Sequence, residues 1–197
     1  MNLSEMIALV RKDLHDEDSN NYQWSDDELA RHIGRAVKEL SGRMPLLAKA
    51  TLPTTPGSAE VDISSLTNRV MVQAVEYPVD EPSAKYQRFS LWGDTLTILS
   101  GDEPNGDNCY VYYGRLHTLD ADGSTIPAEY EDLVASGAGG YAAIERAAAT
   151  INRANIGGMM TPKEYRLWGN ERLEVFREAL KRLGRRQRLR SQQLFQE

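Results

Sequence analysis

The feature that most constrains this chain is the stretch WSDDELARHIGRAVKELSGRMP, residues 24–45, because it has the pattern of one amphipathic helix. Ser25 is a good N-cap, and Glu28 three residues later completes a capping box. Apolar residues then recur at spacings of three and four: Leu29, Ile33, Ala36, Val37, Leu40 and Met44. Gly42 and Pro45 end the pattern. Because such a helix cannot bury its apolar stripe alone, the rest of the chain must supply partners for it.

Three other segments have helical periodicity. Together with residues 25–44, helices are predicted over residues 4–15, 126–155 and 161–190. Ser4 is expected to cap the first helix, and Pro127 to occupy the first position of the third. Thr161 and Glu164 predict a second capping box at the start of the last helix.

Glycines interrupt the predicted helix over residues 126–155. Gly137, Gly139 and Gly140 each weaken a helix interior by roughly 1 kcal/mol relative to alanine. Either the helix breaks there, or close packing against another helix compensates. The small neighbours of these glycines favour packing, and the expected helix-packing residues are Gly137, Ala138, Gly140 and Tyr141.

The middle of the chain has the pattern of β-strands. Alternating or β-branched runs cover residues 60–63, 69–77, 86–92, 95–99 and 108–113. Gly93 and Asp94 are a candidate two-residue hairpin turn. These runs predict a small antiparallel sheet of four or five strands. The expected fold class is α+β: a four-helix bundle from both chain ends with an inserted antiparallel β-sheet, and an extended C-terminal helix or tail.

The charge of the chain is unevenly distributed. The net charge is -6, yet residues 181–190 hold six basic side chains and no acidic one. Three interpretations of this segment are open: docking onto a neighbouring protein, a solvated helix end, or nucleic-acid binding. Docking is favoured by the apolar pair Leu194 and Phe195 beyond it. Neither secretion nor membrane spanning is expected, since no apolar run approaches 18 residues and no signal peptide is apparent.

No group of residues in the sequence predicts a catalytic or metal-binding site. Asp16, Asp18, Asn20 and Asp27 imitate the spacing of a calcium-binding loop, but Asn21 stands where that loop needs glycine. A polar loop is the favoured interpretation.

Single residues of catalytic or metal-binding type also lack partners in the sequence. His15, His32 and His117 lack metal-ligand spacing, and His32 is expected on the polar flank of its helix. Cys109 is alone. The alternating tyrosines from Tyr110 to Tyr113 could meet a neighbour or belong to an ordinary sheet core. We therefore expect no metal, no cofactor and no enzymatic activity.

Three motifs, taken in order, resemble a known family. These are VRKDLHDED, WSDDELARHIGRAVKELSGRMP and IPAEYEDLVASGAGGYAA, and the order of helices and strands around them is similar to that of tailed-bacteriophage head-to-tail adaptor proteins, also called connector or tail-tubular proteins. The resemblance implies a single adaptor domain over residues 1–197. Its parts would be a helical hairpin (1–48), an inserted β-subdomain (49–122), C-terminal helices (123–180) and a basic docking tail (181–197).

The resemblance also implies a function without chemistry. The protein would be a structural virion component that forms a homo-oligomeric ring, usually of twelve copies, beneath the portal protein. That ring would join the capsid to the tail or to a stopper or nozzle protein. It would extend the channel through which genomic DNA passes without sequence-specific binding, and it would take part in genome ejection.

The resemblance assigns a place and a docking segment as well. The protein would sit in the virion neck after assembly in the host cytoplasm, with no membrane contact. The expected portal-docking residues are Lys181, Arg182, Arg185, Arg186, Arg188, Arg190, Leu194 and Phe195. The alternative is a nucleic-acid-binding accessory protein that uses the same basic C-terminal segment.

Overall fold

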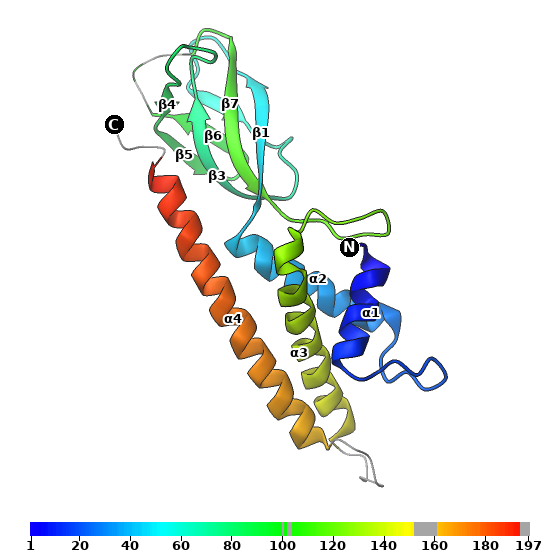
Figure 1. Cartoon of the computed structure of the whole chain (residues 1–197). Helices are drawn as coiled ribbons and strands as arrows, with labels where there is room; N and C mark the ends of the chain where they lie inside the picture. Colours follow the sequence, from blue (N-terminus) through cyan, green and yellow to red (C-terminus); the bar gives the residue numbers. More distant parts are fainter. Residues whose placement is uncertain (100, 102–103, 152–160, 194–197) are drawn as a thin grey trace. The chain divides into compact units, whose positions relative to one another are not determined.

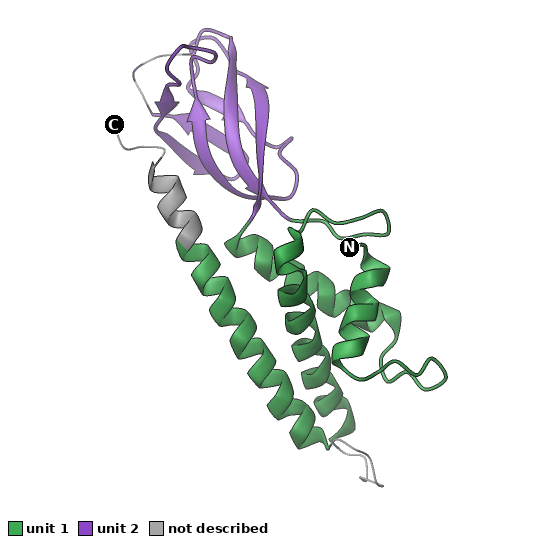
Figure 2. Ribbon diagram, in the orientation of Figure 1, with its two compact units in different colours: residues 1–44, 117–187 green, residues 45–116, 188–197 purple. Residues whose placement is uncertain are grey.

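The computed structural model describes residues 1–99, 101, 104–151 and 161–193, with side chains described as far as residue 185. The chain divides into two compact units (Figure 2). Among the described residues, 1–44 and 117–187 form the first, here called the helical unit, and 45–116 and 188–193 form the second, here called the β unit. The mixture of helices and antiparallel strands that the sequence predicts is confirmed.

The first two helices begin at side-chain caps. α1 spans Leu3–Asp13 and α2 spans Asp26–Arg43. The capping box expected before α2 is confirmed: the Glu28 amide donates to Ser25 Oγ at 3.2 Å, and the Ser25 amide donates to the Glu28 carboxylate at 2.7 Å. The cap expected for α1 is wrong. Asn2 caps that helix, because its side chain accepts from the Glu5 amide at 3.0 Å and Glu5 accepts from the Asn2 amide in return.

The third α-helix differs from the expectation at its start, whereas the last begins as expected. Pro127 precedes a short 3₁₀ turn, η1 (Ala128–Tyr130), and α3 (Glu131–Thr150) follows it. α3 runs unbroken through its glycines, while the predicted end at residue 155 lies outside the described residues. The capping box before α4 (Pro162–Gln193) is confirmed by the bonds between Thr161 and Glu164, at 2.6 and 3.3 Å.

The four described α-helices, drawn in Figure 1, all contribute side chains to one hydrophobic core in the helical unit. Met6 of α1, Leu29 of α2, Ala138 of α3 and Phe176 of α4 are all fully buried within it. The apolar stripe predicted on α2 is the face that enters this core, which explains why its spacing of three and four is so regular.

The described residues of the β unit form seven strands, which Figure 1 labels β1 to β7. One antiparallel sheet has the order β1 (Leu46–Pro53), β7 (Asn108–Arg115), β3 (Arg69–Glu76), β4 (Tyr86–Gln87). The other has the order β2 (Glu60–Asp62), β6 (Thr95–Ile98), β5 (Phe89–Trp92). Both sheets contribute to one core, in which Val75 and Val111 come from the first sheet and Leu96 from the second.

The expectation of a single sheet of four or five strands is therefore wrong. The run over residues 86–92 is divided, because β4 pairs with β3 while β5 pairs with β6. β1 was not expected, since its sequence LLAKATLP is poor in β-branched residues. Pairing with β7 along its whole length overrides that weak propensity.

Candidate interaction surfaces

The glycines of α3 lie where α4 crosses it. A Cβ added at Gly140 would lie 2.9 Å from Leu173 Cγ and 3.1 Å from the backbone oxygen of Gly169. A Cβ at Gly137 would lie 3.0 Å from the ring of Phe176. These approaches are closer than side chains tolerate, so the absence of Cβ atoms is what lets the two helices come together. The weakening of α3 by its glycines is offset by this contact.

The other two expected packing residues also lie in the helical core. Ala138 is fully buried, and Tyr141 is 5% exposed. The Tyr141 hydroxyl donates to Glu39 of α2 at 2.5 Å, and the Arg35 guanidinium lies 3.8 Å from the centre of the tyrosine ring. Burial, with the bond to Glu39, raises the pKa of the Tyr141 hydroxyl. Tyr141 thus connects α3 to α2, while the glycines connect α3 to α4.

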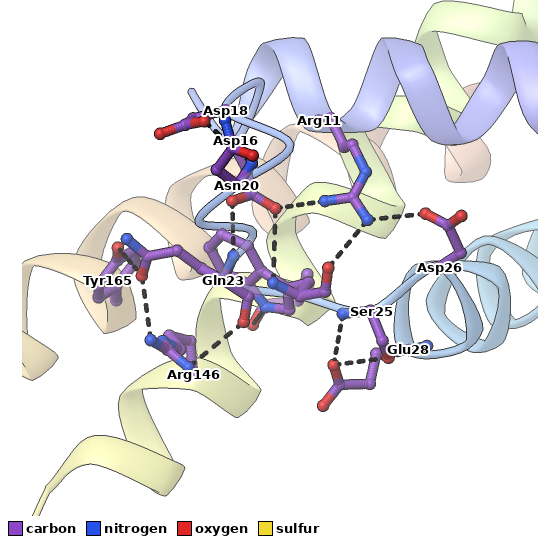
Figure 3. A network of polar contacts seen from close by, with 12 residues as sticks. Arg11, Asp16, Asp18, Asn20, Gln23, Ser25, Asp26, Glu28, Arg146 and Tyr165 are labelled. Atoms are coloured by element: carbon purple, nitrogen blue, oxygen red, sulfur yellow. Dashed lines mark hydrogen bonds and ion pairs between the residues drawn. The ribbon is translucent and has the colours of Figure 1, made fainter.

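A buried arginine organises the loop between α1 and α2 (Figure 3). The guanidinium of Arg11 donates to Asp16 at 2.5 Å, to Asp26 at 2.7 Å and to the carbonyl of Trp24 at 2.9 Å. Asp16 also accepts from the Gln23 amide at 2.7 Å. The carboxylate of Asp16, which matches a calcium-ligand position in the sequence, therefore accepts hydrogen bonds from Arg11 and from backbone amides. Arg11 was not among the expected site residues, although its position four residues after Ile7 was a signal that it belongs to the inner face of α1.

The described residues contain no group of three or more His, Cys, Asp or Glu side chains that could hold a metal ion. The expectation for His32 is wrong, because its side chain is buried and its Nε2 lies 2.6 Å from the carboxylate of Glu145. Burial lowers the pKa of His32, and Glu145 opposes that shift. His117 is buried as well, with Nε2 3.0 Å from the carbonyl of Met44 and Nδ1 2.9 Å from that of Thr125. Both histidines connect parts of the helical unit.

The basic C-terminal segment continues α4 beyond the hydrophobic core. Leu180 is buried and Leu183 packs against the core, whereas Lys181, Arg182 and Arg185 are exposed. The backbone of residues 186, 188 and 190 is helical and their side chains are not described, while Leu194 and Phe195 lie outside the described residues. Leu183 is therefore the last described residue of this segment that packs against the core.

The β unit carries an exposed tryptophan that was not among the expected site residues. Trp92 ends β5 and is 89% exposed, immediately before the expected two-residue turn, which is confirmed. Arg69 holds this turn, since its guanidinium donates to the Gly93 carbonyl and to Asp94, both at 3.0 Å. The sequence did contain a signal for this exposure, because the tryptophan stands directly before a predicted Gly-Asp turn. A large aromatic side chain on a fixed turn suits protein contact.

Within the part of the chain that the structure describes, no helix is long and apolar enough to span a membrane. The sequence model of the family described as SU10 adaptor protein matches residues 1–193. No curated protein matches the sequence significantly.

Proposed function

This chain belongs to the SU10 adaptor protein family, a family of tailed-phage head-to-tail adaptors, and from that premise we propose that its copies form a ring beneath the portal. The family is structural, so the protein is a component of the virion neck that works among capsid, portal and tail proteins. The family match over residues 1–193 is the observation that carries the proposal. In a closed ring, each copy presents one face to the neighbour before it and another to the neighbour after it.

The end of α4 is the segment that we assign to the portal. Lys181, Arg182 and Arg185 are exposed where the helix leaves its own core, and they precede further basic residues in the sequence. Guanidinium groups suit bidentate pairing with carboxylates on a partner protein. The proposed docking tail therefore has a clear start, because Leu183 still belongs to the core.

The Trp92 turn, at the end of β5, is the part that we assign to contact with a further neck or tail protein. Trp92 stands exposed on a turn that Arg69 holds in place, which supports contact with a stopper, nozzle or tail protein.

DNA would pass the ring without sequence-specific contacts. The net charge of -6 supports this step, since like charge limits binding to phosphates.

Electron microscopy of the full chain, alone and with portal-bearing capsids, tests the ring and its place. The proposal expects rings on the portal vertex, and capsids that never acquire a ring after incubation with the protein would refute it.

A chain cut after Arg185 keeps the whole described core, so it should fold normally and fail to bind portals. Retention of portal binding by that shortened chain would refute docking through the tail. A gel shift of bare duplex DNA that disappears in the shortened chain would instead favour the nucleic-acid-binding alternative.

A further inference from the structure

The outer side of α4 carries an acidic groove with an apolar floor, here called the α4 groove. Its volume is about 670 Å³, and Glu171, Glu174 and Glu178 lie along it on α4, with Arg182 at its end and Tyr130 and Leu133 on its other side. Val175 lies among the three glutamates and is 65% exposed. Glu178 pairs with Lys181 at 2.5 Å, while Glu171 and Glu174 have no ion pair among the described residues. The groove thus offers negative charge around an uncovered apolar side chain.

The outer side of α2 carries the opposite charge, and its basic residues are here called the α2 ridge. Arg31, Arg35 and Lys38 are exposed there, around a shallow groove of about 560 Å³ that Gly34 also lines. Arg31 pairs with Glu145, Arg35 lies 3.5 Å from Glu39, and Lys38 has no ion pair within the described part of the chain. The ridge keeps positive charge available to a partner.

Gly34 lies in the interior of α2, where glycine weakens a helix. A Cβ added at Gly34 would meet nothing within 4 Å, unlike one added at Gly140. Packing within the chain therefore does not require a glycine at this position. The close approach of a helix from another copy would require it.

The charges on the two helices have matching intervals when one helix is read backwards. Along α4 the glutamates are three and then four residues apart. Along α2, from Lys38 back to Arg31, the basic residues are also three and then four residues apart. Two antiparallel helices have the same rise per residue, so all three charges can face one another over about 10 Å. The facing pairs are Glu171 with Lys38, Glu174 with Arg35, and Glu178 with Arg31. In the same register Val175 faces Gly34, where the space for a side chain is open.

We propose that the α4 groove of one copy packs antiparallel on the α2 ridge of a second copy. A single copy cannot join the two surfaces, because both helices turn their other side to the same core. A contact between different surfaces of identical chains is heterologous, and such contacts produce rings when the rotation closes. The proposal rests on the proposed ring and names the surfaces that form it. The chemistry of the partner is that of the α2 ridge: exposed cations around a helix glycine.

Charge reversal tests the pairing. The acidic-side variant is Glu171→Lys with Glu174→Lys, and the basic-side variant is Arg35→Glu with Lys38→Glu. Each alone puts like charges together, so each should self-associate at least roughly tenfold more weakly than the unaltered protein, by light scattering or on portal-bearing capsids. An equimolar mixture should regain assembly, because opposite charges then alternate around the ring. The control, Lys12→Glu with Glu17→Lys, reverses exposed charges on neither surface and should assemble normally.

Cysteine pairs test the register. Gly34→Cys with Val175→Cys should form disulfide-linked ladders of chains under mild oxidation. Gly42→Cys with Val175→Cys is the matched control, because Gly42 also has open space for a Cβ but lies two turns along α2, about 12 Å away. The control should remain monomeric on a non-reducing gel. Cys109 is buried in the β unit, so it should not contribute.

The outcomes separate the inference from the proposed function. Rings that form normally in both charge variants, or a mixture that does not recover, would overturn the helix pairing and leave the ring itself standing. Equal ladders from both cysteine pairs would overturn the register. Absence of rings from the unaltered protein, alone and on portals, would overturn the proposed function and the inference together.

Discussion

Replacing Gly140 by alanine should separate the two effects that a helix glycine has on stability. In a helix interior, alanine is favoured over glycine by about 1 kcal/mol. At Gly140, however, the added Cβ would lie 3.1 Å from the backbone oxygen of Gly169 and 2.9 Å from Leu173 Cγ. Leu173 can change its rotamer, but a carbonyl oxygen moves only when α4 moves. The crossing of α3 and α4 must therefore open.

The magnitude follows from these two terms. Overpacking of a well-packed core destabilises a protein by about 1–3 kcal/mol. Against a gain of about 1 kcal/mol from helix propensity, Gly140→Ala should lower the free energy of unfolding by about 1 kcal/mol. Gly34→Ala is the matched control, since its Cβ meets nothing and only the propensity gain remains. The two variants should thus differ by about 1–3 kcal/mol, with opposite signs.

Urea unfolding followed by tryptophan fluorescence measures this difference, at a protein concentration low enough to keep the chain monomeric. Trp24 is buried and Trp168 half-buried in the helical unit, while Trp92 is exposed and should change its emission little. The signal therefore reports the unit that contains the crossing. If Gly140→Ala stabilised the unit as much as Gly34→Ala does, the close approach of the two helices would not hold, and the argument for the role of the α3 glycines would fail.

Three other predictions concern single side chains. Arg11→Met should lower the free energy of unfolding by roughly 3–5 kcal/mol in urea unfolding, because it leaves the buried carboxylate of Asp16 without its cation. Adding Asp16→Asn should recover part of that loss, and additive effects of the two substitutions on stability would argue against the Arg11–Asp16 ion pair. Burial lowers the pKa of His32 below its usual 6.5, so the unfolded chain binds more protons and stability should fall as the pH falls from 7 to 5; His32→Gln should flatten this dependence, and an unchanged slope would contradict it. Trp92→Ala should change stability by less than about 0.5 kcal/mol in thermal melts, since the side chain is 89% exposed, and a larger loss would mean that it packs within the chain.

The family and much of the local structure could be predicted from the sequence. The stripe from Leu29 to Leu40 fixed the inner face of α2, and the capping boxes at Ser25 and Thr161 fixed two helix starts. These features are local, because a cap or a stripe depends on residues within one or two turns of each other. The resemblance to tailed-phage adaptors rested on such local motifs in order, and the family match over residues 1–193 confirms it.

Other features depended on contacts between residues far apart in the chain. β1 exists because β7 pairs with it, and His32 is buried because α3 covers it, although neither sequence segment indicates this by itself. The sequence left open whether the glycines of α3 break the helix, since the answer depends on what faces them. Only the packing of Gly169 and Leu173 against Gly140 decided it, because the steric need for glycine arises from the partner helix and not from the residue's own neighbours.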